Sequence, residues 1–535
     1  MIDKPWRLWN RLSCPIASVL LSALHLHAGA ADPLVLNGRS RIPASDNSGR
    51  VEAFAARWEW DPAQTALVIC DMWDRHWCQG ASRRVAELAP AINEVARLAH
   101  ARGVLIIHAP SDVVDHYRDH PARQRALAAP KAASLPDGID RWCRWINEEE
   151  KAAGYPIDDS DGGCDCDPPC PHGPPYPWRQ QIDAIEIASV DAISASGAEI
   201  WNLLEQRGIR NVLLCGVHAN MCVLGRPFGL RNLARFGKNA ALIRDLTDTM
   251  YNSRRSPHVS HFTGTDLLIA HIERHVCPTV LSTDLTGRAP FVFGNDRRPR
   301  IVFISSENEY RAAETLPRFI GTLQLEHDLA CELAQGQSGS ARPNQAPVTG
   351  LESLARADLA VVFARRRALP ADQMNCLRGY LARGRPLLGL RTASHAFDTR
   401  GNCPPGFAEW IEFDRDVLGG NYQGHHGAGP SVTVDIAPDA RNHPILEGIE
   451  SPFTSAGSLY RNTPLRAGSI PLLVGSIPGK HLEPVAWTHL RAGSRVFYTS
   501  LGHPSDFEKR SFQRLLINAI EWAMSRPEPL EVRPR

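Results

Sequence analysis

The sequence predicts two tandem α/β domains, each with three layers in which helices cover both faces of a mostly parallel sheet. With 535 residues, the chain is longer than one hydrophobic core usually serves. Strand-like apolar runs alternate with amphipathic helical patterns from residue 64 to about 283, and a second alternation runs from about 300 to 524. Because strands that alternate with helices usually form parallel sheets, we expect this fold class in both halves.

The first alternation opens with the strand pattern QTALVICD at 64–71, which ends in an acidic residue. In the helical pattern at 81–103, apolar residues recur at helical spacing and Gly103 ends the helix. Further strands are expected at 104–110, 211–217, 239–245 and 279–283, and further helices at 197–208 and 265–275. These elements place the first domain at 61–285.

A Cys-, Pro- and Gly-rich segment at 155–178 interrupts this alternation and predicts a long inserted loop. Two roles are open for its polar residues, a metal site or one disulfide. The candidate side chains are Cys164, Asp165, Cys166, Asp167, Cys170 and His172. Their spacing matches no standard zinc knuckle, so a disulfide or a purely structural loop is the favoured interpretation.

A linker is expected at 286–297 and a second α/β domain at 298–525, followed by a short tail at 526–535. The first strand of this domain, at 300–306, leads into a helix expected to continue to about Leu333. A loose polar insertion follows at 335–347. The remaining strand patterns lie at 358–363, 386–390, 431–436, 484–490 and 495–501, and the helical ones at 370–384 and 512–524.

The N-terminus has the order of a secretory signal peptide at 1–30. Basic residues come first, an apolar run follows at about 15–24, and the small residues Ala28, Gly29 and Ala30 close the segment. We therefore expect export to the periplasm or the extracellular space, with 31–60 as an N-terminal extension. No apolar run is long enough to span a membrane, so we expect no membrane span.

The charge balance and the cysteine content limit the classes of partner and of fold that the chain can have. The 59 basic and 58 acidic residues nearly cancel, which excludes the basic surface that a nucleic-acid-binding protein needs. The expected partners are a small-molecule substrate, possible carbohydrate included, and a second copy of the chain. The 13 cysteines are spread along the chain and do not predict a compact disulfide framework.

Cys222 lies in the stretch GVHANMCVLGRP, just after a strand pattern and at the start of a helical one. It is a buried core residue, half of a disulfide, or a nucleophile. Ligands of open parallel sheets bind beyond the carboxyl ends of the strands, where Asp71 also lies. A helix start favours the thiolate, a neighbouring carboxylate can act as base, and backbone N–H groups can hold an oxyanion.

The motifs VICDMWD, LLCGVHANMCV, ALIRD and TDTM resemble the isochorismatase-like cysteine hydrolase family, which includes nicotinamidases. The resemblance implies that Asp71 is the base and Cys222 the nucleophile. It also implies a cis peptide bond at Val217–His218 that shapes the oxyanion pocket. No cofactor is required by this chemistry.

The chain departs from the family at a catalytic lysine that should precede the helix at 197–208. Ser189 falls near that position, and Arg179 and Lys131 are the candidate replacements. Several family members bind a divalent metal through an Asp-x-His loop. The residues here that correspond to this loop are Asp115, His116 and His120.

Other polar and aromatic residues near the two strand ends have open roles. Trp73 and His76, with Trp77 and His218, line a pocket for a planar or ring-shaped substrate or serve as packing. Asp245 and Asp248 are interpreted as structural caps.

The second half resembles the ThuA-like (trehalose utilisation) family, whose fold is close to the flavodoxin-type fold of class I glutamine amidotransferases. The resemblance rests on RPLLGLRTASHAF, VLGGNYQGHHG and PVAWTHLRAGSRVFYTSLGHPSDF. Arg391 and Thr392 stand where an amidotransferase has its cysteine, so glutaminase chemistry is not expected. The expected pocket residues, or alternatively loop residues satisfied by backbone and water, are Glu307, Tyr310, Arg391, His395, His425, His426 and His503.

These observations predict an exported cysteine hydrolase that acts on a C–N bond of a small, sugar-derived amide. One alternative is that the ThuA-like half processes a carbohydrate while the first half is a degenerate scaffold. Another is a sugar-binding protein without catalytic activity.

Overall fold

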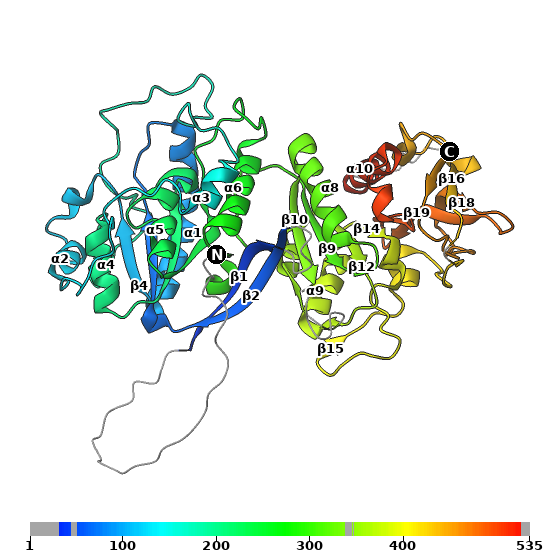
Figure 1. Ribbon diagram of the computed structural model, residues 1–535, viewed down its shortest axis with the longest axis horizontal. Coiled ribbons are helices and arrows are strands. Elements are labelled where there is room, and N and C mark those ends of the chain that lie inside the picture. The colour runs from blue at the N-terminus through cyan, green and yellow to red at the C-terminus, as the bar shows by residue number, and fades with distance from the viewer. Residues whose placement is uncertain (1–31, 44–50, 337–344, 346, 428, 526–535) are drawn as a thin grey trace, which may run out of the picture.

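The computed structural model describes residues 32–43, 51–336, 345, 347–427 and 429–525. Figure 1 shows two α/β halves side by side, the first coloured blue to green and the second green to red. Each half has helices on both faces of a sheet, as the sequence predicts. The expected signal peptide at 1–30 and the tail at 526–535 lie outside the described residues.

The first sheet has the strand order β2-β1-β8-β7-β6-β3-β4-β5. From β3 onward its strands are parallel, whereas β1 and β2 form an antiparallel hairpin that joins the sheet through β8. The region expected as an extension at 31–60 therefore contributes two strands. The bounds are β1 (Leu34–Pro43), β2 (Val51–Trp60), β3 (Thr65–Cys70), β4 (Leu105–Ala109), β5 (Ala192–Ile193), β6 (Asn211–Val217), β7 (Asn239–Asp248) and β8 (Thr279–Val280).

Helices cover both faces of this sheet. α1 (Gln79–Ala101) packs its apolar stripe on the face that carries Leu67 and Ile69. The other face, with Val68 and Cys70, is covered by four helices. They are α2 (Pro121–Ala128), α4 (Gly197–Gln206), α5 (Leu230–Arg235) and α6 (His261–His275). Two short helices, α3 (Glu148–Ala153) and α7 (Thr283–Thr286), complete this half.

The second sheet has the order β11-β10-β9-β12-β14-β20-β19-β18-β16-β17, with a small separate pair β13-β15. Strands β10, β9, β12, β14 and β20 are parallel, and the others add antiparallel at the two edges. The parallel strands are β9 (Arg300–Ser306), β10 (Ala330–Gly336), β12 (Leu359–Ala364), β14 (Leu387–Leu390) and β20 (Ser494–Thr499). The antiparallel strands are β11 (Val348–Thr349), β13 (Leu369–Pro370), β15 (Phe407–Ala408), β16 (Val432–Ile436), β17 (Phe453–Ser455), β18 (Ile470–Ser476) and β19 (Glu483–Arg491).

Three helices sandwich this sheet. α8 (Ala312–His327) and α10 (Arg510–Met524) pack on one face, and α9 (Ala371–Ala382) packs on the other. The helix expected to continue to Leu333 ends at His327, and β10 follows within a few residues. The apolar residues of this segment fit both periods, and pairing with β9 decides in favour of a strand.

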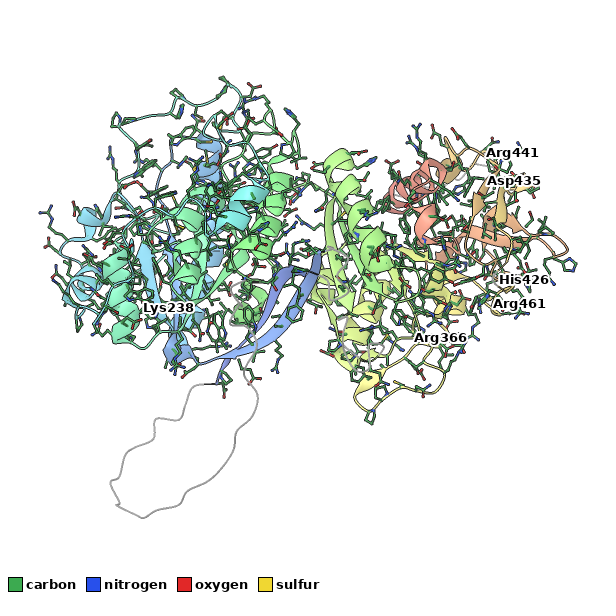
Figure 2. The ribbon with its side chains drawn as sticks, in the orientation of Figure 1. Lys238, Arg366, His426, Asp435, Arg441 and Arg461 are labelled. Atoms are coloured by element: carbon green, nitrogen blue, oxygen red, sulfur yellow. The ribbon has the colours of Figure 1, made fainter. Side chains whose placement is uncertain are left out.

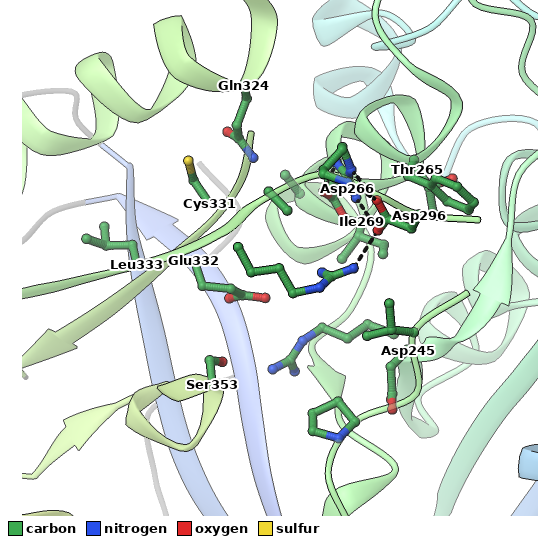
Figure 3. Close-up of a pocket in the computed structure, with 18 of the residues that line it drawn as sticks. Asp245, Thr265, Asp266, Ile269, Asp296, Gln324, Cys331, Glu332, Leu333 and Ser353 are labelled. Atoms are coloured by element: carbon green, nitrogen blue, oxygen red, sulfur yellow. Dashed lines mark hydrogen bonds and ion pairs between the residues drawn. The ribbon is translucent and has the colours of Figure 1, made fainter. Parts of the chain in front are cut away.

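The β1–β2 hairpin reaches the second half (Figure 1), and there Arg39 of β1 pairs with Glu332 of β10 at 2.6 Å. Within the first half, Arg39 also pairs with Glu273 of α6 at 2.7 Å. A cavity of about 390 Å³ lies between the halves, lined by Asp245, Asp266 and Glu332 among others (Figure 3). None of its lining residues is Asp71 or Cys222. None of the described helices combines the length and the apolar character that a membrane crossing requires.

Gly216 decides how closely β6 approaches β3. Its φ is +103°, and a Cβ built on it would lie 2.1 Å from the carbonyl oxygen of Cys70. That atom belongs to the neighbouring backbone, so it cannot move aside cheaply. A glycine is therefore required at position 216, where the carboxyl ends of β3 and β6 come together.

We expect Gly216→Ala to destabilise the protein by at least about 2 kcal/mol more than Gly208→Ala. Gly208 has φ +62° with nothing within 4 Å of a built Cβ, so its substitution costs only the left-handed backbone, about 1 kcal/mol. Urea unfolding of both variants measures the difference. Equal losses would show that the contact with Cys70 is not limiting.

Candidate functional site

Cys222 and Asp71 meet at the carboxyl ends of two adjacent parallel strands. Asp71 directly follows β3, and Cys222 lies in a helical turn, Ala219–Val223, directly after β6. The strands pair with Cys70 opposite Gly216. Asp71 is fully buried and Cys222 is 8% exposed, with its thiol free. The sequence-based expectation that these two side chains share one sheet edge is confirmed.

Asp71 is held by contacts on both carboxylate oxygens. Its backbone has φ +47°, in the left-handed region. Oδ1 accepts a hydrogen bond from the Ser111 N–H at 2.7 Å, and Oδ2 lies 3.4 Å from Nε of Arg226. The carboxylate is thus held close to both the Cys222 thiol and the Arg226 guanidinium.

Arg226 is the cation that sequence analysis missed. It follows Cys222 by four residues, and its N–H donates to the Cys222 carbonyl at 3.1 Å. The two expected replacements for the family lysine, Arg179 and Lys131, are both exposed. Neither has an ion pair with Asp71, so the structure corrects this expectation. The sequence shows only that Arg226 is close to Cys222 along the chain, and this spacing alone does not place its guanidinium at Asp71.

The surroundings of Cys222 and Asp71 do not favour the thiolate that the sequence suggested. Burial raises the pKa of the Cys222 thiol well above its usual value, and the Asp71 charge raises it further, while Arg226 lowers it. Burial also raises the pKa of Asp71, and Arg226 opposes this. These shifts favour a protonated thiol at rest, whereas the helix start in the sequence suggested a thiolate. A carboxylate more basic than usual is suited to take its proton.

The Val217–His218 peptide bond is cis, which is the geometry that the family resemblance implies. The His218 side chain is buried, and its Nε2 has no hydrogen-bond partner. Burial, together with the nearby His76, lowers the pKa of His218 well below its usual value. His218 is therefore a neutral side chain next to the nucleophile turn.

A stack of aromatic rings lies beside this turn. Trp73 stacks on Trp178 with ring centroids 4.5 Å apart, and Trp178 stacks on Tyr176 at 4.3 Å. His76 contacts Trp178 at 5.7 Å and His218 at 5.0 Å. Trp178 and Tyr176 belong to the inserted loop, so sequence analysis named only part of this group. Burial and Arg84 lower the pKa of His76 to about 4, which keeps it neutral near pH 7.

The structure does not bring the expected metal ligands together. Asp115 and His116 are exposed, and His120 caps α2 by accepting the Ala122 N–H at 3.1 Å. Within the part of the chain that the structure describes, a different set of side chains converges as potential ligands. Asp115, His116 and His120 therefore do not fit a shared metal.

Asp245 and Asp248 are structural, as interpreted from the sequence. Asp245 accepts hydrogen bonds from the Ser282 and Phe291 N–H groups. Asp248 lies 2.7 Å from Arg84 and 2.8 Å from His261. Burial opposes its ionisation, but His261 and Arg84 outweigh this and hold its pKa below the usual range.

The second half has its own polar and aromatic cluster. Arg391 directly follows β14 with φ +43° and is 1% exposed; its guanidinium lies 4.0 Å from the Tyr310 ring centroid and 4.9 Å from that of Tyr460. His395 stacks on Tyr422 at 4.6 Å. Burial and Arg366 lower the pKa of His395 to about 2.

The other expected pocket residues divide into two groups. His425 contacts the Tyr460 ring at 6.2 Å, and His503 contacts Tyr310 at 6.5 Å, so both join the cluster. Figure 2 shows His426 and Arg461 near each other at the edge of the second half that faces away from the first half. Glu307 instead accepts the N–H groups of Glu309, Tyr310 and Ala312, which fixes the turn before α8.

Residues 305–523 match the ThuA family, described as trehalose utilisation. No curated protein is found to match the chain. The second half is similar in structure to a ThuA-like protein of Bacteroides uniformis, with 18% identity over 44% of this chain and 95% of the other, and a TM-score of 0.33.

Similar structures also include a cysteine hydrolase of Pseudomonas syringae pv. phaseolicola, with 16% identity, 43% of this chain and 94% of the other covered, and a TM-score of 0.27. An isochorismatase family protein of Burkholderia thailandensis has 14% identity, with 42% and 95% covered and a TM-score of 0.25. Both resemblances expected from the sequence are thus found. The chemistry of the first half has to be derived from its own residues.

The opposite charges beside Cys222 predict opposite effects on its alkylation. Asp71→Asn removes the charge that raises the thiol pKa, so alkylation should set in at a pH lower by about one unit or more. Arg226→Gln should move it to higher pH. Iodoacetamide labelling of Cys222 across pH, followed by mass spectrometry, measures both.

The exposed Cys376 of the second half is the internal control and should react alike in all variants. Identical profiles for Cys222 in the two variants would contradict the electrostatic assignment.

Proposed function

We propose that the first half is a cysteine hydrolase that cleaves the C–N bond of a small amide. The observation that carries this is the convergence of a buried thiol, a buried carboxylate and a guanidinium at one sheet edge. Structural thiols, such as Cys215 in the neighbouring part of β6, lie in an apolar core without such partners.

The proposed reaction begins with transfer of the Cys222 proton to Asp71 as the sulfur forms a bond to the carbonyl carbon. The carbonyl oxygen takes up the electron pair, and backbone N–H groups of the turn after the cis peptide stabilise this oxyanion. The intermediate then collapses, and the leaving nitrogen takes the proton from Asp71. Water, deprotonated by Asp71, hydrolyses the thioester and restores the thiol.

Arg226 would hold Asp71 in place. It would also limit the rise in the pKa of Asp71 that burial of the carboxyl causes. Its guanidinium also contacts Asp112 at 3.3 Å and the Trp142 ring at 5.4 Å, so it is fixed from several sides. This is the role that the family assigns to a lysine from another strand.

The substrate class follows from the surroundings of Cys222. The stack of Trp73, Trp178 and Tyr176 favours a flat or ring-shaped molecule. His76 and His218 are neutral, and Arg226 is already paired, so no free charge awaits an ionic group. An uncharged, planar carboxamide fits best. The signal-like order at 1–30 supports the further proposal that the chain is exported.

Ammonia release from a panel of small carboxamides tests this function. Cys222→Ala should lower kcat by about 1000-fold or more, because no other group can form the covalent intermediate. Cys215→Ala, which removes a buried thiol from the apolar core side of β6, the strand that leads to Cys222, is the matched control and should stay active.

Unchanged turnover in Cys222→Ala would refute the nucleophile assignment. Saturable ligand binding with no product from any amide, ester or glycoside would favour a binding protein instead.

A second candidate function is carbohydrate binding or processing by the second half. The match of 305–523 to the ThuA family and the ring cluster around Arg391 favour it. Arg391 is 1% exposed, and its guanidinium lies against the rings of Tyr310 and Tyr460. The half-buried Tyr422 and the exposed His425 are better placed to contact a sugar.

We expect Tyr422→Ala to weaken saccharide binding by about tenfold or more, because the substitution removes the aromatic ring on which the apolar face of a sugar would stack. Phe453→Ala, which removes another half-buried ring at the far edge of the same sheet, is the matched control. Calorimetric titration with disaccharides measures both. Equal affinities in the two variants would place the ligand elsewhere.

A further inference from the structure

Four cysteines from two distant segments meet at the start of α1. Cys78 directly precedes that helix, while Cys164, Cys166 and Cys170 come from the inserted loop. Their sulfur atoms all lie within 4.8 Å of one another, and no disulfide joins them. The sequence alone indicates only the three cysteines of the loop as a group, because Cys78 is more than 80 residues away in the chain.

The spacing of the sulfurs fits a single tetrahedral ion. A zinc–thiolate bond of about 2.3 Å places two sulfurs of a tetrahedron about 3.8 Å apart. The Cys78 and Cys166 sulfurs are 3.8 Å apart. A disulfide requires about 2.05 Å, so these atoms are too far apart for a bond and close enough to share one ion.

Backbone N–H groups point at every one of the four sulfurs. At the start of α1, the Gln79, Gly80 and Ala81 N–H groups donate to Cys170, Cys166 and Cys78 at 3.4, 3.2 and 3.5 Å. The Cys170 N–H donates to Cys164 at 3.4 Å. N–H donors thus surround all four sulfurs, and the positive end of a 23-residue helix lies beside them, which suits a site that holds anionic ligands of a metal ion.

Charge and packing around the cluster are also compatible with four thiolates. In the sequence, Asp165 stands between Cys164 and Cys166. Its carboxylate pairs with the Arg84 guanidinium at 2.6 Å, which neutralises its charge. Gly80 makes room for this carboxylate, since a Cβ there would lie 2.5 Å from its Oδ1. Cys78 and Cys164 are buried against Met250, and Cys166 and Cys170 close the outer side.

We propose that Cys78, Cys164, Cys166 and Cys170 bind one structural zinc ion. Four thiolates in a tetrahedron are characteristic of zinc or of iron, and a set with no open position indicates a structural ion. Zinc is the inferred metal because the site is formed from thiolates alone and needs no redox partner.

The zinc would fix the inserted loop next to the catalytic groups. The Cys78 N–H donates to His76 at 3.1 Å, and the cluster packs on Met221, the neighbour of Cys222. Trp178, which stacks on Trp73, follows the last zinc ligand by eight residues. The ion would therefore hold together the two segments, residues 73–78 and the inserted loop, whose rings form the aromatic stack. The zinc site itself does not depend on the proposed hydrolase function.

Elemental analysis of the purified full-length chain tests the proposal, with one zinc per chain expected. Cys78→Ser and Cys166→Ser should each lose the zinc. Cys376→Ser, at an exposed thiol of the second half, is the matched control and should keep it. Stoichiometric iron in place of zinc would overturn the assignment.

A measurement on the unmodified chain avoids variants that fail to fold. Native alkylation should spare the four cysteines, and it should label them after a mercurial reagent has released the zinc into a colorimetric chelator. Cobalt that replaces the zinc should give the visible absorption of a tetrahedral thiolate site. A disulfide between any two of the four, or metal-free protein in which all four react at once, would overturn the proposal.

Discussion

The close approach of β6 to β3 is the constraint on which the site in the first half depends. The two strands can meet at their carboxyl ends only because Gly216 has no side chain where the Cys70 carbonyl lies. This contact brings a carboxylate and a thiol from distant parts of the sequence into one buried space. The cis peptide bond that follows then turns the chain into the helical segment with Cys222.

Burial of this pair creates an electrostatic problem that Arg226 resolves. Burial raises the pKa of both acidic groups, the Asp71 charge raises that of Cys222 further, and the Arg226 guanidinium lowers both. The guanidinium comes from the same turn as Cys222, four residues further along the chain.

The inserted loop is joined to this site at two places. Its cysteines meet the start of α1, and its last aromatic residues stack on Trp73 just after β3. Between these points, Arg84 of α1 pairs both with Asp165 of the loop and with Asp248 at the end of β7. A loop without regular structure is thereby held to the sheet by contacts between cysteines, by an ion pair and by stacked rings.

The sequence by itself determined the two α/β halves and the meeting of Asp71 with Cys222. Both follow from local patterns, because alternating strand and helix runs define the layers and parallel strands align their carboxyl ends. It also indicated Trp73 and His76, which directly follow the same strand. The period of an apolar run was less decisive at 330–336, where strand pairing replaced the expected helix.

Only the tertiary structure decided which side chains complete the site. The choice of Arg226 over Arg179 and Lys131 depends on the direction of side chains that no spacing rule encodes. The fourth cysteine, Cys78, joins the loop through a contact across more than 80 residues. The depth at which the fold buries Cys222, and its closeness to Asp71, raise the pKa of the thiol, and neither is encoded in the local sequence.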